Sequence, residues 1–236
     1  DYYVIGVIRS NSELHITGNT NILSEFEKGY GLYLGEGTTN SFNKDSSGNG
    51  IMNISTGVRG SHSIGNTDFN QEVHVRLNAN GATGILTSDT ASSSLTNFNE
   101  KVYITNNSVS NNTSTAYGIA VNNLKGTFNL NDGAVIEFDD TYTNGNEIGL
   151  YSGKGTLNVQ GDLSIKTNSG NIQSVIYATN NGTINITNSV ADLKGDILSN
   201  NGARIMMDIK EGSKWEGASR TANSASADIS MTGTVW

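Results

Sequence analysis

Few side chains in this chain of 236 residues could do chemistry, and the adjacent acidic pair Asp139 and Asp140 is the first to consider. Two carboxyl groups about 6.5–9.5 Å apart can serve as general acid and general base in glycoside hydrolysis. The pair lies in FDDTYTNGN (138–146), a segment without histidine, lysine or arginine. We therefore interpret it as part of a solvated surface turn and expect no catalytic residue in the chain.

The histidines are the next candidates, because imidazole binds metals and transfers protons. His15, His62 and His74 show no His-x-x-x-His spacing, and the chain has no cysteine. Disulfides, thiolate catalysis and cysteine-ligated zinc are thereby excluded. The G-G-x-G-x-D repeat of calcium-binding β-rolls does not occur either. We expect no metal and no cofactor, and alternation predicts that His74, between two valines, is exposed.

The charge and hydropathy of the chain exclude two further classes of partner. Its formal charge is −8 at pH 7, without clusters of lysine or arginine, so it should repel the phosphates of nucleic acid and of anionic lipids. A membrane-spanning helix needs about 20 predominantly apolar residues, and the sequence has no such run. We expect neither nucleic-acid binding nor membrane insertion.

Any site in this chain must be positioned by short strands, because the sequence repeats a unit of alternating apolar residues. The segments AYGIAVNN (116–123), EIGLYSGK (147–154) and QSVIYATN (173–180) each lead into a Gly-Thr segment, of which GTLNVQGD (155–162) is an example. The unit returns every 22–34 residues. One unit cannot bury its apolar face alone, so we expect the units to stack.

Two columns of residues extend this register over the chain. We expect the first, a glycine followed by an aliphatic residue, to mark tight corners with positive φ. The second, an apolar residue followed by asparagine, should direct the asparagines outward, because Phe128 and Leu130 point inward to stack on Leu157, Val159, Ile184 and Ile186. The first column is Gly6-Val7, Gly31-Leu32, Gly57-Val58, Gly84-Ile85, Gly118-Ile119 and Gly149-Leu150, continued by Ile176 and Leu198. The asparagines of the second are Asn43, Asn70, Asn99, Asn129, Asn158 and Asn185.

A third set of strand-like segments follows the second column in each unit. Each unit thus holds about three short strands, separated by turns rich in asparagine, glycine and serine. Stacking equivalent strands gives an all-β fold, a parallel β-helix (solenoid) of roughly eight rungs. The segments are VHVRL (73–77), VYIT (102–105), AVIEF (134–138), DLSI (162–165) and ADL (191–193).

These features resemble the passenger domains of autotransporter adhesins of Gram-negative bacteria. The resemblance rests on the Gly-aliphatic openings, the GTLNV and GTINI strands, the polar turns, and GSKWEG (212–217) leading to SADISMTGTVW (226–236). It covers most of the chain and implies a right-handed parallel β-helix, exported through the outer membrane and acting at the bacterial cell surface or as a secreted protein. We interpret residues 1–236 as a single β-helix fragment of a longer passenger, with 220–236 as the last partial rung.

The resemblance implies an adhesin that mediates host-cell attachment or bacterial aggregation by non-catalytic contact. Its partners would be a host-cell surface protein or glycan, another bacterial surface protein, or a second copy of itself. Two alternatives stay open. A polysaccharide-degrading β-helix enzyme, a lyase or a hydrolase, uses the same scaffold, and a structural stalk would only hold a distal binding domain away from the cell.

Contact residues are expected where a repeat departs from its minimum length, since such loops often carry function. The longest intervals between column glycines, 34 and 31 residues, place extra residues in 106–116 and 139–146. The second loop predicts an aromatic platform with amide and carboxylate groups. A self-association ladder formed by the six outward asparagines is the other candidate. Tolerated insertions and merely solvated asparagines are the competing interpretations. The predicted loop site comprises Asp139, Asp140, Tyr142, Asn144 and Asn146.

Overall fold

Strands joined by turns make up the part of the chain that the computed structural model describes, residues 2–24, 28–79, 81–88, 93–107, 115–138, 147–167 and 174–232. Within these ranges no segment forms a helix of the length and apolarity needed to span a membrane. Every pairing between described strands is parallel. The predicted all-β class and the predicted parallel pairing are therefore confirmed.

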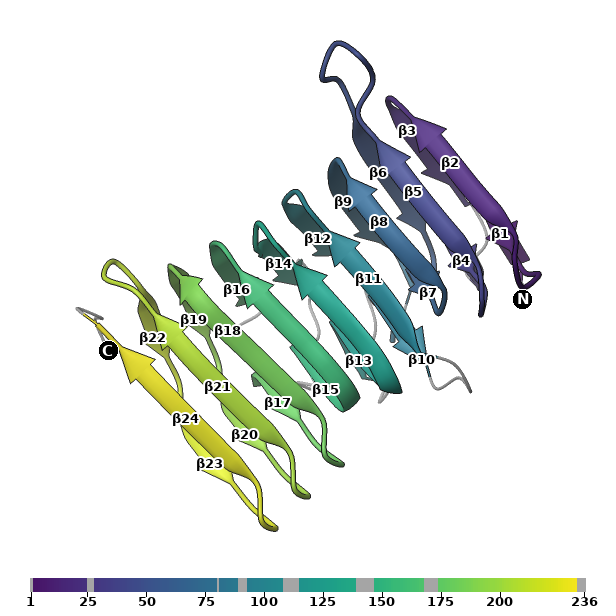
Figure 1. Ribbon diagram of the computed structural model, residues 1–236. Helices are drawn as coiled ribbons and strands as arrows, with labels where there is room; N and C mark the ends of the chain where they lie inside the picture. The colour runs from purple at the N-terminus through teal and green to yellow at the C-terminus, as the bar shows by residue number, and fades with distance from the viewer. Residues whose placement is uncertain are drawn as a thin grey trace.

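The strands form three series that run the length of the molecule, and each series is a row of hydrogen-bonded neighbours (Figure 1). The first series is β1 (Tyr2–Val7), β4 (Gly29–Leu34), β7 (Arg59–Ser63), β10 (Thr83–Ser88), the beginnings of β13 (Ala116–Leu130) and β15 (Glu147–Gln160), β17 (Ser174–Ala178), β20 (Ile197–Ser199) and β23 (Ser219–Thr221). The second series is β2 (Glu13–Thr17), β5 (Thr39–Asn43), β8 (Asn66–Asn70), β11 (Ser94–Phe98), the ends of β13 and β15, β18 (Thr183–Ser189), β21 (Arg204–Ile209) and β24 (Ser226–Met231).

The third series is a separate sheet of eight strands. It holds all five segments that the sequence predicts as the third strand of a unit. Its members are β3 (Thr20–Leu23), β6 (Ile51–Thr56), β9 (Glu72–Leu77), β12 (Val102–Asn106), β14 (Ala134–Phe138), β16 (Leu163–Thr167), β19 (Ala191–Lys194) and β22 (Lys214–Glu216). Each consecutive set of described strands adds one strand to each series, so that eight complete sets are followed by β23 and β24.

Alternation along each strand directs every second side chain into one core shared by the three series. This core is a single cluster of buried apolar residues that extends from Ile22 to Trp215. Four phenylalanine rings of the second series, Phe42, Phe69, Phe98 and Phe128, follow one another in it at 4.8, 4.3 and 5.2 Å. The predicted stacking of Phe128 and Leu130 is confirmed, because β13, β15 and β18 pair these positions and all six side chains are buried.

The glycine column exists for a different reason from the one that we expected. Gly31, Gly84, Gly118 and Gly149 do not adopt positive φ, so the prediction of left-handed corners is wrong at these positions. A Cβ on Gly118 would lie 2.6 Å from the Gly149 carbonyl oxygen and 2.7 Å from Cγ2 of Ile136. The column is glycine because the branched side chains of the third series occupy the space of a Cβ.

The register of the first column also differs from the prediction at three places. Gly60, and not Gly57, lies between Gly31 and Gly84, since Tyr30 pairs with Arg59 and Leu32 with Ser61. At the amino end Val7 pairs with Leu34. At the carboxyl end Leu198 pairs with Tyr177, and Ile197 occupies the inward position. A shift of one to three residues was hidden in the sequence because turns of varying length separate the strands.

Candidate functional site

The predicted loop site lies outside the described residues. Asp139, Asp140, Tyr142, Asn144 and Asn146 all belong to 139–146, between the end of β14 and the start of β15. Of the other long segment, 106–116, residues 108–114 are likewise outside them. The two segments stay candidates from the sequence alone.

The six asparagines of the predicted self-association ladder are hydrogen-bonded within the chain, in two ladders and not one, and their contact with a second copy stays a prediction. Asn70 donates from Nδ2 to Oδ1 of Asn43 at 2.8 Å, Asn99 donates to Asn70 at 2.6 Å, and Asn131 donates to Asn99 at 2.6 Å. The second ladder lies two residues earlier along each strand. Its bonds of 2.7–2.8 Å run in order through Asp68, Asn97, Asn129, Asn158 and Asn185.

The single column drawn from the sequence crosses from one ladder to the other between Asn99 and Asn129. The strands β11 and β13 pair Asn97 with Asn129, which is a shift of two residues. A shift of two keeps every side chain on the same face of a strand, so the inward and outward pattern conceals it. The second ladder ends at Asn185, whose partner position is Met206 and whose buried Oδ1 has no hydrogen-bond partner.

The three histidines are far from equivalent. His15 is exposed, and its Nδ1 lies 2.7 Å from the Ser41 hydroxyl. His62 is buried on the outer side of the first series, beneath a cluster of tyrosines that includes Tyr30 and Tyr33. Its Nε2 lies 2.8 Å from the Ser88 hydroxyl, whereas its buried Nδ1 has no partner. No group of three or more His, Cys, Asp or Glu side chains in the described ranges could hold a metal ion.

His62 is expected to make folding pH-dependent. Its burial, and secondly the Arg59 guanidinium, lower its pKa from 6.5 to about 4. Between these pH values the unfolded state binds more protons than the folded state. The contribution of neutral His62 to the free energy of unfolding is therefore fully present above pH 6.5. It is lost as the pH drops toward 4, by at most about 3 kcal/mol. Urea unfolding at several pH values should show that this loss is absent from His62→Gln. A difference between the two proteins that is independent of pH would contradict the assignment.

A groove on the outer face of the third series is a candidate binding site in the described structure. Its volume is about 470 Å³, and four neighbouring strands, β3, β6, β9 and β12, supply its walls. We call it the β9 groove. Its lining residues are Asn21, Ile22, Leu23, Asn53, Ile54, Ser55, His74, Val75, Arg76, Tyr103 and Thr105.

An aromatic pair forms the centre of the β9 groove. The ring of His74 stacks on that of Tyr103, with 4.5 Å between centroids and 28° between planes. His74 Nε2 lies 3.1 Å from Oε2 of Glu72, so the imidazole is held from the side. Asn53 donates from Nδ2 to Oδ1 of Asn21 at 2.9 Å on the adjacent strands. The arrangement places an aromatic pair beside oriented amides, a combination that suits sugar rings and peptide edges.

Local alternation places these groups in the groove. In β9 the residues Val73, Val75 and Leu77 point into the core, so His74 and Arg76 point outward. The predicted exposure of His74 is confirmed at 40% of its side chain. The sequence pattern does not reveal the groove, although it predicts both VHVRL and VYIT as third strands. Their register, which pairs His74 with Tyr103, was the signal that could have revealed it.

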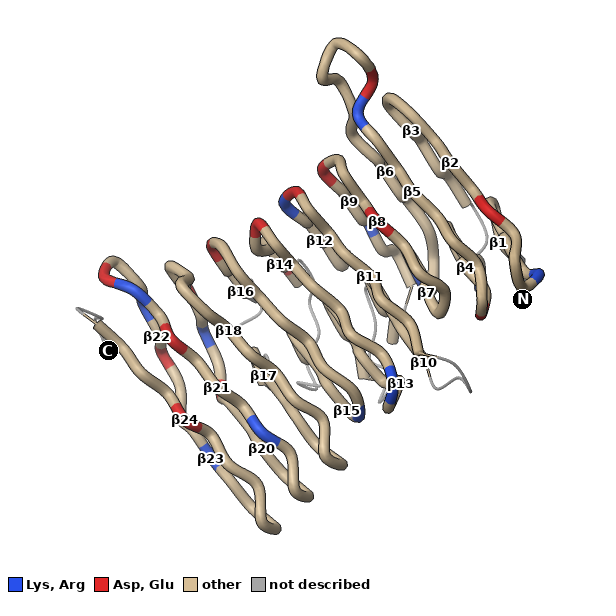
Figure 2. Tube along the Cα trace, viewed as in Figure 1, with Lys and Arg blue, Asp and Glu red and all other residues tan. Residues whose placement is uncertain are grey.

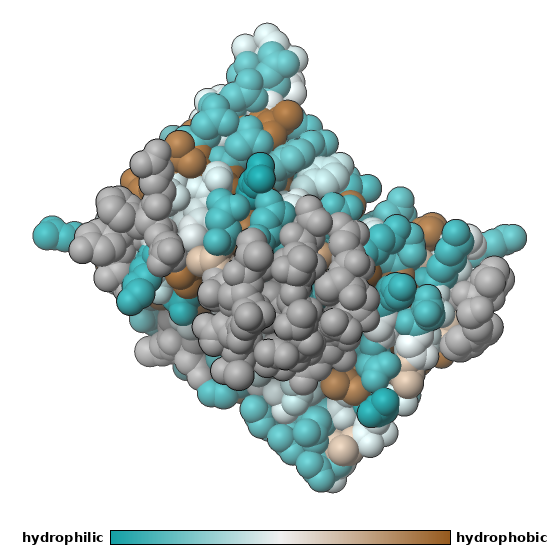
Figure 3. All heavy atoms as spheres, turned by 180° about the vertical axis from the view of Figure 1, so that it is seen from behind, coloured by the Kyte–Doolittle hydropathy of each residue, from teal (hydrophilic) through white to brown (hydrophobic). Residues whose placement is uncertain are grey.

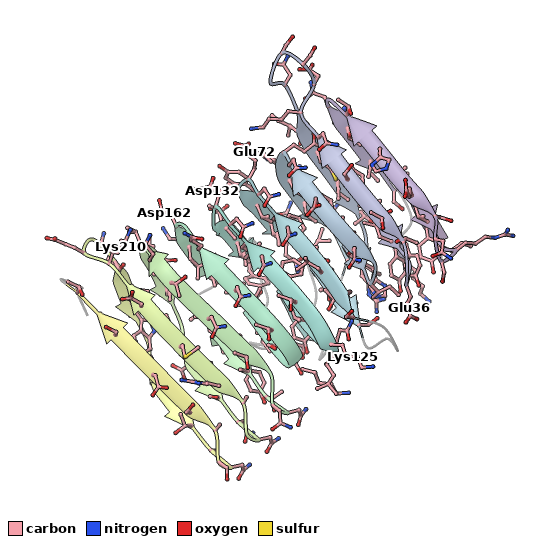
Figure 4. All side chains as sticks on the ribbon, in the orientation of Figure 1. Glu36, Glu72, Lys125, Asp132, Asp162 and Lys210 are labelled. Carbon is pink, nitrogen blue, oxygen red and sulfur yellow. The ribbon has the colours of Figure 1, made fainter. Side chains whose placement is uncertain are left out.

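The charged residues of the rest of the described surface lie both at turns and within strands. Figure 2 shows acidic and basic residues where one strand ends and the next begins, as near β9, β12 and β14, and also along strands, as near β22 and β24. Glu72, Asp132, Asp162 and Lys210 lie along one edge of the second series, and Glu36 and Lys125 lie at its other edge (Figure 4). From behind, the described residues are mostly teal or white, with brown residues in separate patches (Figure 3). The ladders are thus bordered by charge.

Comparison with known proteins gives no match for this chain. No protein-family model, no curated protein and no solved structure is similar to it. Its function must therefore be argued from its own strands and side chains.

Proposed function

We propose that the chain is a section of a right-handed parallel β-helix from the passenger domain of a bacterial autotransporter, and that it works as a cell-surface adhesin by non-catalytic contact. Three parallel series of strands with one shared core are what such a fold requires. The proposed export route and surface location rest on the sequence resemblance. The β9 groove supplies a means of contact, and it is the observation on which the binding function depends.

The groove suits a glycan of a host cell or of another bacterium better than it suits a flat protein surface. It is concave, and it combines the His74–Tyr103 stack with the Asn21–Asn53 amide pair. Aromatic faces contact the apolar side of a sugar ring, and amides bond to its hydroxyl groups. Repeating strands about 4.8 Å apart carry the groove over roughly 14 Å, enough for more than one sugar unit. We therefore propose an oligosaccharide as the partner.

Tyr103→Ala tests this function. Loss of the ring should weaken binding to responsive oligosaccharides on a glycan array, and to fixed epithelial cells, about threefold to tenfold. The fold should be retained, because the Tyr103 side chain lies outside the core. Circular dichroism and thermal unfolding check that retention.

Tyr177→Ala is the matched control for the groove variant. Tyr177 is also a half-buried tyrosine in a ring contact, 5.6 Å from Tyr151, but it lies on the first series and outside the groove. It should leave binding unchanged. Equal binding by wild type and Tyr103→Ala, or an equal loss in both variants, would contradict a contact role for the groove.

A polysaccharide-degrading enzyme is the second candidate, and it draws on the same groove. The contact between His74 and Glu72, with Arg76 two residues further on β9, is a set that can move a proton. Glycoside hydrolysis mostly uses two carboxyl groups, and the described lining of the groove contains none. Release of reducing ends or unsaturated uronic products during incubation with polysaccharides would favour the enzyme over the adhesin.

The asparagine ladders are a weaker candidate for contact with a second copy of the chain. Each internal amide of a ladder already uses one N–H and one oxygen lone pair within the molecule, for example at Asn97, Asn129 and Asn158. We therefore assign the ladders to cohesion between successive strands and place binding in the groove. A structural stalk would be favoured if the chain bound no cell and no glycan.

A further inference from the structure

The β9 groove is lined by a guanidinium and by no carboxylate, although the chain as a whole carries a formal charge of −8. Arg76 is the one residue of the groove lining that is always charged, and no aspartate or glutamate is among the lining residues. A smaller hollow of about 280 Å³, further along the third series, instead mixes Lys101 and Lys214 with Asp162 and Asp192. Charge complementarity therefore favours an anionic ligand in the β9 groove specifically.

The guanidinium of Arg76 is held in position for such a ligand. With the Asn107 amide oriented so that its oxygen faces Arg76, that oxygen accepts bonds from Nε at 3.0 Å and from Nη2 at 3.1 Å. Asn107 is itself anchored, because its backbone N–H donates to the Leu77 carbonyl oxygen at 2.9 Å. A guanidinium has five N–H donors, so three are left after these two bonds. A fixed, planar guanidinium is well suited to bind a carboxylate through two parallel bonds.

The two charged residues of β9 lie toward opposite ends of the strand, Glu72 at its start and Arg76 near its end. Glu72, His74 and Arg76 occupy alternate positions on the outer face, so the Cα atoms of Glu72 and Arg76 lie about 13 Å apart, and the Glu72 carboxylate contacts His74 between them. The aromatic stack lies between them, about 7 Å from Arg76 along the strand. A sugar ring on Tyr103 would thus point an attached carboxylate toward Arg76 and away from Glu72. Ser55 and Thr105 flank Arg76 on the neighbouring strands and offer hydroxyl groups.

We infer that the ligand of the β9 groove is an acidic oligosaccharide, with its ring on the His74–Tyr103 stack and its carboxylate paired with Arg76. This inference rests on the proposed function and adds the chemical class of the glycan. A carboxylate fits better than a phosphate, because a single guanidinium matches its one negative charge and its planar pair of oxygens. Neutral glycans lack the group that Arg76 would bind.

The test compares acidic oligosaccharides with their uncharged counterparts on wild type and on Arg76→Gln. The probes are tetragalacturonate with its methyl ester, and sialyllactose with lactose, each measured by isothermal titration at constant pH and salt. Wild type should bind the acidic member of at least one pair about tenfold to a hundredfold more tightly, and Arg76→Gln should abolish that preference. Arg76→Lys should retain part of it, because lysine keeps the charge but loses the planar fork.

Arg9→Gln is the matched control, since Arg9 is an exposed arginine in the turn between β1 and β2. It should leave the preference intact. Equal affinity for both members of every pair, or a preference that survives Arg76→Gln, would overturn the inference. Binding of neutral glycans that is lost in Tyr103→Ala would overturn it while leaving the proposed function in place. Absence of binding to every probe and to cells would overturn both.

Discussion

Phe69→Ala is expected to lower the free energy of unfolding by about 3–5 kcal/mol, as for other phenylalanines removed from a core. The Phe69 side chain is fully buried, and its ring is within 8° of parallel to those of Phe42, 4.8 Å away, and Phe98, 4.3 Å away. Paired strands hold both neighbours in place, so they cannot close the cavity that an alanine leaves. Urea unfolding followed by far-UV circular dichroism measures the change.

Leu95→Ala is the control for this substitution. Leu95 lies on β11, also in the second series, but its side chain is 42% exposed, so its loss should cost less than about 1 kcal/mol. Phe69→Leu should fall between the two. Similar losses for Phe69→Ala and Leu95→Ala would show that the phenylalanine stack does not stabilise the fold.

The loss caused by Phe69→Ala should also be local. Stacked repeats contact only their neighbours, so a weakened unit opens without unfolding the whole. Hydrogen exchange should therefore lose protection first in β5, β8 and β11, the strands that carry Phe42, Phe69 and Phe98. This pattern separates a defect in one contact from a general loss of stability.

Gly133→Ala is expected to destabilise the chain by about 4 kcal/mol. Gly133 has φ +74°, which costs about 1–2 kcal/mol for any residue with a side chain. A Cβ there would lie 1.9 Å from the Asp162 carbonyl oxygen, an overlap with backbone that no rotamer can relieve. That oxygen cannot move away freely, because it accepts a bond from the Ala134 N–H at 3.0 Å. Denaturant midpoints measured for both proteins give the difference.

Gly48→Ala separates the two causes. Gly48 has a similar φ of +81°, but a Cβ there would meet nothing within 4 Å. It should therefore cost only the conformational part, about 1–2 kcal/mol. If both variants lost the same stability, close approach of the Asp162 carbonyl would not be the reason for glycine at position 133.

The cohesion between successive strands has a polar part as well as an apolar part. The phenylalanine stack runs on the inner side of the second series, and the two asparagine ladders run on its outer side. Each hydrogen bond between two asparagine side chains joins one strand to the next. A hydrogen bond of this kind typically contributes about 1 kcal/mol. The ladders therefore reinforce the same stacking that the buried rings produce.

The candidate site shows how far sequence reasoning reached. Alternation in VHVRL and VYIT predicted third-series strands and an exposed His74, and both predictions are confirmed. The stack on Tyr103 and the bonds from Arg76 to Asn107 join residues 29 to 31 positions apart. No local pattern specifies which outward residues become neighbours across strands. The loop of Asp139, Asp140 and Tyr142 stays a prediction.

What the sequence by itself determined is the strands and the face on which each side chain lies, because a period of two decides burial within a single strand. Only the tertiary structure decided which residues lie above one another. Repeats of 22–34 residues leave the register between paired strands open. The register shift of two residues between Asn99 and Asn129 keeps each side chain on the same face, so the pattern of burial does not reveal it. The reason for the glycine column is likewise visible only in the tertiary structure, because Ile136 and its counterparts pack against these glycines. Contacts between stacked strands, and the β9 groove with them, are properties of register.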